Sequence, residues 1–326
     1  MVKSFRSLPL LRGKATAARR TVTLVAFYLA GLTLVWASLA GPALAREIAV
    51  LKSSDIAAYN QAVAGMRSEF PDSAVTITEY DMQGDVARGR KLARKIRAAD
   101  VNAVIAVGLK AALVAKLEIV DVPVIYCMVL DPGKYDLHAP NMTGITLQIP
   151  LERQLATMHS VLPRMKRIGV LYDPEKTGPI VEEARRLAKG LDLELVERRV
   201  SSERNLPETL REVITKVDAL WLLPDSTVLT DDSLRFVLST ALDRSVPVIG
   251  FSSEFVRNGA LIGLSVNSGD IGRQAGAMAK KILNGRSPAS AAVSPDRVRF
   301  ALNLKTARFL GLTLPPDVVN RADELY

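Results

Sequence analysis

The side chains that carry out nucleophilic and metal chemistry are scarce in this 326-residue sequence. Cys127 is the single cysteine, and His138 and His159 are the two histidines. A catalytic thiol needs a base beside it, whereas Cys127 falls in the apolar run 124–129, which is typical of a buried strand. A transition-metal site needs several such ligands together. The sequence therefore predicts a protein that is not an enzyme and has neither a metal site nor a cofactor.

Polar and aromatic side chains follow directly after several short apolar runs. They offer hydroxyls, backbone donors, carboxylates and rings, which suit the binding of a small molecule, but no acid–base–nucleophile set. The glycines between Gly269 and Gly276 do not follow a strand in the manner of a phosphate loop and instead indicate the start of a helix after a crossing between lobes, which disfavours a nucleotide-binding loop. The candidate ligand-binding residues are Ser53, Ser54, Gly108, Leu109, Lys110, Asp131, Tyr172, Asp225, Ser226, Thr227, Phe251, Ser252, Glu254 and Asn267.

Several of these candidates also have a purely structural interpretation. Ser53 and Ser54 are good caps for a following helix, a role compatible with ligand contact. Lys110 is of a type that is usually solvated, and Asp131 before a proline is common turn chemistry.

The candidates in the second half of the chain face the same alternatives. Tyr172 and Phe251 are either core residues or rings at the ends of strands. Asp225 follows a buried run, so we expect an exposed carboxylate that pairs with a ligand cation and contributes little to folding.

The apolar runs form two series built on one plan, with an offset of about 120 residues. Helical spacing of apolar residues separates the runs, as in 86–96 and 180–188. The paired runs are 46–51 with 166–171, 101–107 with 217–223, and 121–125 with 245–249.

Alternating strands and helices predict an α/β protein of two similar Rossmann-like lobes. Each lobe has a parallel sheet flanked by helices, and the lobes are hinged around a central cleft. Ligands bind beyond the carboxyl ends of such strands, where the candidate residues lie. The first lobe is expected to span 46–147 and about 266–290, and the second 148–265 and about 291–326. Crossings between them are expected near Gln148, Ser265–Asn267 and Ala291.

Residues 1–45 have the pattern of a secretory signal. Six Lys and Arg and no carboxylate are followed by an apolar run from Thr21 to Leu39 and by Ala43-Leu44-Ala45. Cleavage after Ala45 is predicted, and the alternative is an uncleaved membrane anchor. Removing these six cations leaves 37 Lys and Arg against 34 Asp and Glu, so the net charge of +9 largely reflects targeting. This excludes a nucleic-acid partner as the meaning of the high pI.

Several segments resemble the ABC-transporter substrate-binding proteins of the tryptophan/tyrosine-binding type, which have the type I periplasmic-binding fold. The resemblance extends over essentially the whole mature chain. The chain departs from aromatic-binding members at Gly108-Leu109-Lys110 and Phe251–Glu254, where a Thr- or Ser-containing turn and an aspartate-bearing turn are usual. The segments that carry the resemblance are 131–132 (DP), 141–146 (NMTGIT), 166–172 (KRIGVLY), 217–219 (VDA), 270–276 (DIGRQAG) and 281–285 (KILNG).

The resemblance implies a periplasmic receptor that captures a small molecule, an aromatic amino acid first of all, by cleft closure and delivers it to an inner-membrane ABC permease. A ligand sensor of the same fold, free or anchored through the N-terminal segment, is the alternative function. An enzyme on an α/β scaffold is disfavoured because the catalytic set is missing.

Overall fold

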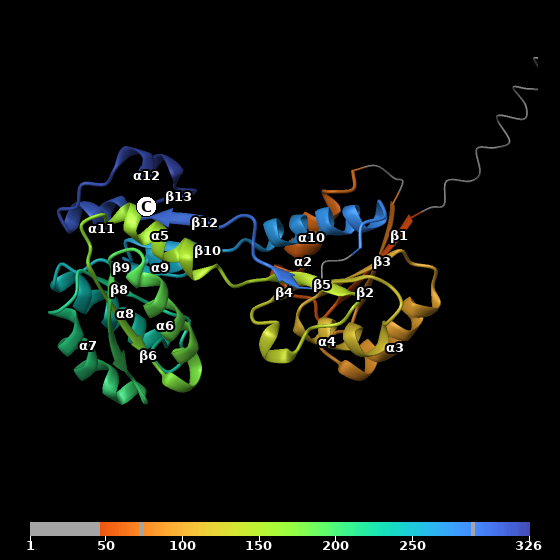
Figure 1. Cartoon of the computed structure of the whole chain (residues 1–326), viewed down its shortest axis with the longest axis horizontal. Coiled ribbons are helices and arrows are strands. Elements are labelled where there is room, and N and C mark those ends of the chain that lie inside the picture. The colour runs from red at the N-terminus through yellow and green to blue at the C-terminus, as the bar shows by residue number, and fades with distance from the viewer. Residues whose placement is uncertain (1–45, 72–74, 288–290) are drawn as a thin grey trace, which may run out of the picture. The chain divides into compact units, whose positions relative to one another are not determined.

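The computed structural model describes residues 46–71, 75–287 and 291–326. The predicted signal segment, residues 1–45, lies outside the described residues. Two sheets organise the described part, the first parallel and the second parallel except for one antiparallel pair, and each is covered by helices on both faces (Figure 1). This confirms the predicted α/β fold of two lobes. No helix of the described residues is long and apolar enough to span a bilayer.

The first lobe has the strand order β11-β5-β4-β3-β1-β2, with every neighbouring pair parallel. Helices α2 and α10 cover one face of this sheet, and α3 and α4 cover the other (Figure 1). Its elements are β1 (Arg46–Lys52), α2 (Ala57–Arg67), β2 (Val75–Asp81), α3 (Val86–Ala98), β3 (Ala103–Val107), α4 (Leu109–Glu118), β4 (Val124–Val129), the 3-10 turn η1 (Gly133–Tyr135), β5 (Met142–Thr146), α10 (Ser268–Leu283) and β11 (Ala292–Val293).

The second lobe has the strand order β13-β12-β10-β9-β8-β6-β7, in which only β10 and β12 pair antiparallel among the described strands. Its elements are α5 (Leu151–Val161), β6 (Arg167–Tyr172), α6 (Pro174–Lys189), β7 (Glu194–Arg199), the 3-10 turn η2 (Glu203–Asn205), α7 (Leu206–Ile214), β8 (Ala219–Trp221), α8 (Asp231–Asp243), β9 (Val248–Gly250), α9 (Ser253–Arg257), β10 (Ile262–Ser265), β12 (Arg299–Leu302), α11 (Leu304–Phe309), α12 (Pro316–Arg321) and β13 (Glu324–Leu325).

The central strands are buried on both faces, as their continuous apolar runs predict. All five residues of β3 are buried, and so are all three of β8 and of β9. Strands of this kind need helices on both sides, because side chains alternate between the faces. These three strands therefore carry no polar side chains themselves, and polar groups occur in the segments that follow them.

Helix α10 returns to the first lobe and packs closely against α2. A Cβ on Gly272 would lie 1.8 Å from the Ala62 carbonyl oxygen, and one on Gly65 would lie 2.0 Å from the Gly269 carbonyl oxygen. Glycines are required at this crossing because the two backbones approach within contact distance. The glycines of 269–276 thus serve helix packing.

Three crossing segments connect the two sheets. The first follows β5 and includes Gln148, and the second lies between β10 and α10. The third was expected near Ala291, but Ala292 and Val293 pair with Gly144 and Ile145 of β5. A short additional strand therefore stays in the first sheet, and the chain crosses between residues 294 and 298.

Candidate ligand-binding site

The turn after β3 is held by Ser53 of the neighbouring strand end. Ser53 is buried, and its hydroxyl accepts a hydrogen bond from the Ala111 backbone N–H at 2.9 Å, within the first turn of α4. Ser53 is therefore a cap, but of the helix after β3 and not of the helix that follows it in sequence. Ser54 is half-buried beside it.

Gly108 joins β3 to α4 with a φ of +90°, which L side chains rarely adopt. A Cβ at this position would lie 2.7 Å from the Ser53 hydroxyl and from the ring and hydroxyl of Tyr59. The lack of a side chain at Gly108 thus allows Ser53 and Tyr59 to pack directly against the backbone at the end of β3. Leu109, the first residue of α4, is half-buried at the same edge.

Tyr59 is a residue of this edge that the sequence analysis did not single out. It lies in the first turn of α2, is half-buried, and has a pKa raised by burial and then by the nearby Cys127. No hydrogen bond of its hydroxyl occurs among the described residues. The sequence signal for this role was an aromatic residue at the start of the helix that follows Ser53-Ser54. Tyr59 does not belong to the apolar spacing that predicts the buried face of this helix.

The end of β4 is irregular. Met128 has a φ of +59°, and the register with β5 shifts between Tyr126 and Val129. A bulge of this kind re-aims side chains at the end of a strand. Beyond it, Leu130 is 58% exposed, and an Asp131 carboxylate oxygen accepts the Lys134 backbone N–H at 3.1 Å. The other Asp131 oxygen has no partner among the described residues.

Two lysines contribute positive charge to this edge. Lys52 is buried at the end of β1, and its ammonium donates to Asp55 at 3.0 Å and to Asn60 at 2.7 Å. The predicted candidate Lys110 donates to the Gly84 carbonyl oxygen at 2.8 Å, which places it beside the end of β2.

Asp225 is the centre of the corresponding turn in the second lobe, and the expectation of an exposed carboxylate is wrong. Asp225 is 2% exposed. One oxygen accepts the Asp173 backbone N–H at 2.8 Å and the Thr177 hydroxyl at 2.6 Å. The other accepts the backbone N–H groups of Thr227 at 2.9 Å and Val228 at 3.3 Å. All its acceptor positions are used within the lobe, so the carboxylate is a structural anchor.

Asp173 belongs to the same hydrogen-bond network as Asp225. It caps α6 through the Glu175 backbone N–H at 3.0 Å, and its second oxygen accepts the Thr227 hydroxyl at 2.6 Å. The Thr227 hydrogen bond, followed by that of Glu175, lowers the pKa of Asp173. Of the predicted residues in this turn, Ser226 is exposed and accepts a hydrogen bond from Lys176 at 2.8 Å.

The two predicted aromatic rings differ in position. Tyr172 is 6% exposed and packs in the core with residues of α5 and α6, so the alternative of a core residue is correct for it. Phe251 is half-buried at the end of β9, with its ring centroid 4.5 Å from that of Phe255. The ring available at this edge is therefore Phe251.

The remaining candidates cap or flank short helices. The Ser252 hydroxyl accepts the Phe255 backbone N–H at 3.4 Å, and Glu254 is exposed on α9. The exposed Asn267 caps α10 by accepting the Asp270 backbone N–H at 3.2 Å.

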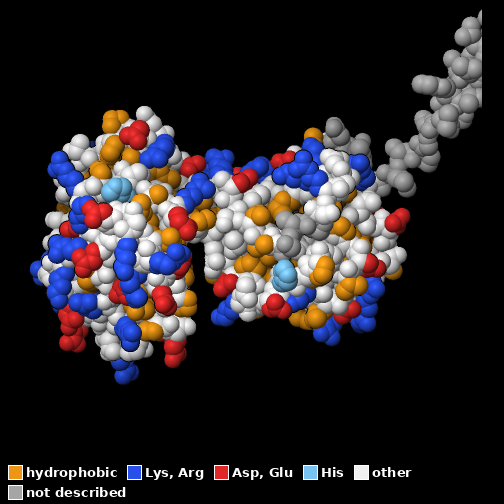
Figure 2. Space-filling view, viewed as in Figure 1, with side chains coloured by type: hydrophobic (Ala, Val, Ile, Leu, Met, Phe, Trp, Pro, Cys, Tyr) orange, Lys and Arg blue, Asp and Glu red, His pale blue; other side chains and the backbone are white. Residues whose placement is uncertain are grey.

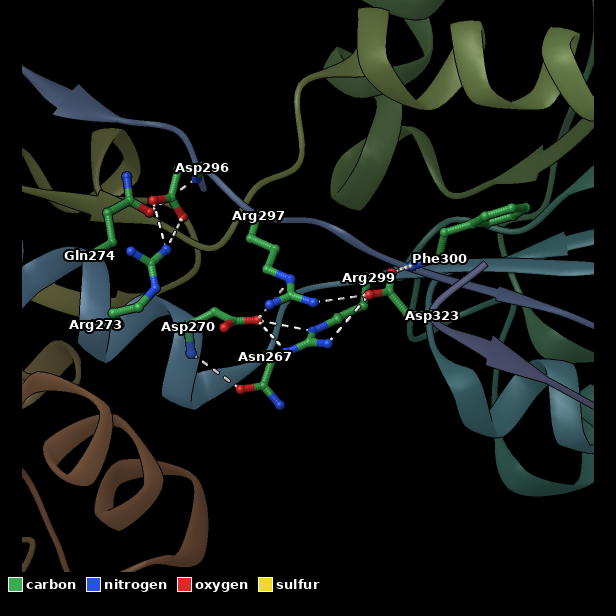
Figure 3. Close-up of polar contacts among 9 residues, drawn as sticks. All are labelled: Asn267, Asp270, Arg273, Gln274, Asp296, Arg297, Arg299, Phe300 and Asp323. Atoms are coloured by element: carbon green, nitrogen blue, oxygen red, sulfur yellow. Dashed lines mark hydrogen bonds and ion pairs between the residues drawn. The ribbon is translucent and has the colours of Figure 1, made fainter. Parts of the chain in front are cut away.

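An ion-pair network surrounds Asn267 at the second and third crossings (Figure 3). Asp270 of α10 accepts a hydrogen bond from Arg299 Nε of β12 at 2.9 Å and forms an ion pair with Arg299 Nη2 at 2.8 Å. Asp323 pairs with Arg299 at 3.3 Å and with Arg297 at 3.2 Å. Helix α10 of the first lobe is thereby tied to the C-terminal segment of the second.

The same side of α10 also holds the third crossing itself. Arg273 donates to both oxygens of Asp296, and the Gln274 amide accepts the Asp296 backbone N–H at 3.0 Å (Figure 3). The hydrogen bond to Asp296 raises the pKa of Arg273. These contacts attach the start of the third crossing, at Asp296, to α10.

A cavity of about 360 Å³ lies away from this edge. It is lined by residues at the opposite end of the first sheet, including Arg46, Asn102 and Arg286. No group of three or more metal-ligating side chains gathers anywhere in the described residues. Among the described residues, the strand-end edges thus offer hydrogen-bond donors, lysines, two half-buried rings and the carboxylates of Asp131, which has one free oxygen, and of the exposed Glu254.

Two relatives of known structure share this fold. A ligand-free, open substrate-binding protein with adhesive properties from Clostridium difficile is 22% identical, with a TM-score of 0.73 over 86% of this chain and 98% of its own. An ABC domain in complex with L-Trp from Streptococcus pneumonia is 24% identical, with a TM-score of 0.56 over 86% and 99%.

Sequence comparisons agree with the structural ones. A protein described as a tyrosine-binding protein of Clostridioides difficile is 23% identical over 247 residues, which are 73% of this chain and 71% of that protein. The family model described as ABC transporter substrate binding protein matches residues 47–326. This match spans every described element beyond the first residue of β1. The chain therefore belongs to the ABC transporter substrate-binding protein family, whose members are binding proteins and not enzymes.

Proposed function

We propose that this protein is the periplasmic substrate-binding component of an ABC importer, which captures an amino acid with an aromatic side chain and delivers it to an inner-membrane permease. The observation that carries the proposal is one half-buried ring at the strand-end edge of each lobe, Tyr59 in the first and Phe251 in the second. A flat apolar ligand held between two lobes needs such a ring on each side. The relatives described as binding tyrosine or tryptophan support this ligand class.

The polar groups of an amino acid find partners mainly in the first lobe. Helix α2 begins at Ala57 after Ile56, which provides no capping side chain, so its first backbone N–H groups suit a ligand carboxylate. Asp131 retains one free oxygen for the ammonium group. Asp225 is no longer a candidate for this role, because all its acceptor positions are used.

Calorimetric titration with L-tryptophan, L-tyrosine and L-leucine tests this proposal. Tyr59→Ala and Phe251→Ala are each expected to weaken binding of the aromatic ligands by at least about fivefold, since a stacked ring contributes about 1 kcal/mol beyond its buried area. Phe309→Ala is the matched control, because Phe309 is 70% exposed on α11. Binding of none of the three amino acids would reject the ligand class, and mass spectrometry of the co-purified small molecule would then identify the correct one.

Closure of the lobes is proposed to turn about the three crossings, with the Asp270–Arg299 pair as the link that resists it. Asp270→Asn is expected to broaden the distance distribution between spin labels on the two lobes of the unliganded protein. Asp232→Asn, a change in an exposed pair on α8, is the control. An unchanged distribution in Asp270→Asn would show that the network does not restrain the hinge.

The periplasmic location rests on the signal-like segment 1–45 and on the family. N-terminal sequencing of the protein from the cell envelope is expected to begin at Arg46. An intact Met1 on membrane-bound protein would instead favour the anchored sensor.

A further inference from the structure

Helix α3 is far more basic than the rest of residues 46–326. Its 13 residues include six cations and no carboxylate, whereas residues 46–326 hold 37 Lys and Arg against 34 Asp and Glu. Cations in the last turn of a helix complement its dipole, but this accounts only for Lys95 and Arg97. The six cations are Arg88, Arg90, Lys91, Arg94, Lys95 and Arg97.

The basic side chains lie on the solvent side of the helix. Gly89, Ala93 and Ile96 are buried against the lobe, and all six cations are exposed. Carboxylates neutralise the cations only in part, because Arg90 and Arg94 share one carboxylate, Glu118, each at 3.8 Å. In the described part of the chain, only Arg97 has a carboxylate of its own, Asp121 at 3.2 Å. Lys91 has no carboxylate within ion-pairing distance among the described residues.

Exposed apolar side chains lie beside these cations at the end of α4. Leu117 is 63% exposed and Val120 is 58% exposed, and they flank Glu118, which pairs with α3. The exposed Tyr135 lies near the same helix, because the adjacent Asp136 pairs with Lys116 at 2.8 Å. Figure 2 shows basic and hydrophobic side chains next to each other over the α3 and α4 region of Figure 1.

We infer that this surface docks on an anionic phospholipid bilayer. The α3–α4 face is defined as Arg90, Lys91, Arg94, Arg97, Leu117 and Val120. Cations on an exposed helix are attracted to acidic headgroups, and neighbouring apolar side chains enter the headgroup boundary. An acidic protein segment would use the cations but would leave Leu117 and Val120 without a comparable apolar environment.

Such docking would confine the receptor to the surface where its permease lies. The inference rests on the proposed export of the protein to the periplasm, but the interaction itself requires neither a ligand nor a permease. The attraction is electrostatic at long range, so it is expected to vanish when salt shortens the Debye length.

Co-sedimentation of residues 46–326 with lipid vesicles tests the inference. The protein is expected to bind phosphatidylglycerol-containing vesicles at about 0.01 M salt, but not at about 1 M, where the Debye length falls from about 30 Å to about 3 Å. Pure phosphatidylcholine vesicles should bind it weakly at both. Each cation near an anionic surface accounts for about fivefold in partitioning. The double substitution Lys91→Glu/Arg94→Glu should therefore reduce binding by at least about 25-fold.

A matched double reversal on the second lobe, Arg204→Glu/Arg235→Glu, removes the same charge from exposed positions and should cause a much smaller loss. Leu117→Ser should weaken binding without changing its salt dependence. Equal losses for the two double variants would overturn the inference, and so would no binding to phosphatidylglycerol at low salt. Binding only when vesicles contain the permease would assign the face to a protein partner and also overturn it.

Two further measurements separate this inference from the proposed function. Slow labelling of Cys127, which is buried in β4, verifies that the first lobe of the α3–α4 variants is folded, and fluorescence of Trp221, which is buried in β8, does so for the control variant on the second lobe. Amino-acid titration of Lys91→Glu/Arg94→Glu should match the parent protein. Loss of vesicle binding with intact ligand binding supports the docking face, whereas vesicle binding without any amino-acid binding rejects only the proposed ligand.

Discussion

The two lobes repeat one fold but close their strand-end turns by different chemistry. In the first lobe, Ser53 caps α4 across the sheet and Gly108 lets Tyr59 approach. In the second, Asp173 and Asp225 form an interlocked pair whose carboxylate oxygens accept six hydrogen bonds from within the lobe. One turn depends on the lack of a side chain, and the other depends on two charges.

Under the proposed function, this difference would give the two lobes different parts in ligand recognition. A carboxylate that is buried and fully hydrogen-bonded is unavailable to a ligand, so the second lobe offers Phe251, Ser226 and the exposed Glu254 instead. The first lobe retains uncapped donors at the start of α2 and a free oxygen on Asp131. We therefore expect most polar contacts with a ligand to come from the first lobe.

Each lobe carries its own natural probe, which makes the comparison measurable. Trp221 is the single tryptophan of residues 46–326 and lies in β8 of the second lobe. Cys127 is the single cysteine and lies in β4 of the first. Tryptophan fluorescence and thiol labelling therefore follow the second and the first lobe separately.

Asp225→Ala is expected to have the largest effect and to act on the second lobe. It leaves four buried or half-buried donors without an acceptor, so the free energy of unfolding followed by Trp221 fluorescence should fall by about 3 kcal/mol or more. Thiol labelling of Cys127 should remain slow under native conditions. Normal stability with lost ligand affinity would contradict the structural role and restore Asp225 as a ligand contact.

Gly108→Ala is expected to have the next largest effect and to act on the first lobe. The new Cβ meets Ser53 and Tyr59 at 2.7 Å, and φ +90° adds backbone strain. We therefore expect the free energy of unfolding to fall by about 2–3 kcal/mol. Gly285→Ala is the matched control, since its φ is +86° and a Cβ there meets nothing within 4 Å. In the control, the free energy of unfolding should fall by about 1 kcal/mol. Equal decreases in the two variants would show that the close approach of Ser53 and Tyr59 to Gly108 is unimportant for stability.

Acid should weaken the second lobe through Asp173 and Asp323. Hydrogen bonds lower the pKa of Asp173. Burial raises the pKa of Asp323, but the hydrogen bond from the Phe300 backbone N–H and the charges of Arg297 and Arg299 outweigh burial, so this pKa is also lowered. Carboxylates with folded pKa values below the ordinary 3.8 stabilise the fold above that pH, and the contribution is lost as pH falls through the folded values. Asp323→Asn should lower stability at pH 7 and flatten the acid dependence of Trp221 fluorescence. An unchanged slope would exclude Asp323 as its source.

The smallest expected effect concerns Cys127 in the unchanged protein. Burial raises the pKa of this thiol to about 12, so almost no thiolate forms at pH 8 and labelling should require opening of the first lobe. Gly108→Ala should accelerate labelling, whereas Asp225→Ala should not. Rapid labelling of the native protein would show that β4 is more accessible than the structure indicates.

Much of the fold follows from local sequence pattern. The β-branched runs, the helical spacing between them and their repetition predict two parallel sheets, because side-chain periodicity and burial are encoded within a few residues. The strand-end location of the candidates follows from the same pattern, since all parallel strands of a sheet end at one edge. The caps Asp173 and Asn267 are likewise local, because each accepts from a backbone N–H two or three residues ahead.

Only the tertiary structure decided what each candidate does at that edge. Asp225 changes from a cation partner to an anchor because Asp173 and Thr177, 52 and 48 residues away, supply its donors. Ser53 caps a helix 58 residues away. Tyr59 gains importance because Gly108 lies beneath it. Hydrogen bonding and burial depend on partners brought together by the sheet, and no local pattern specifies which distant turn will supply them.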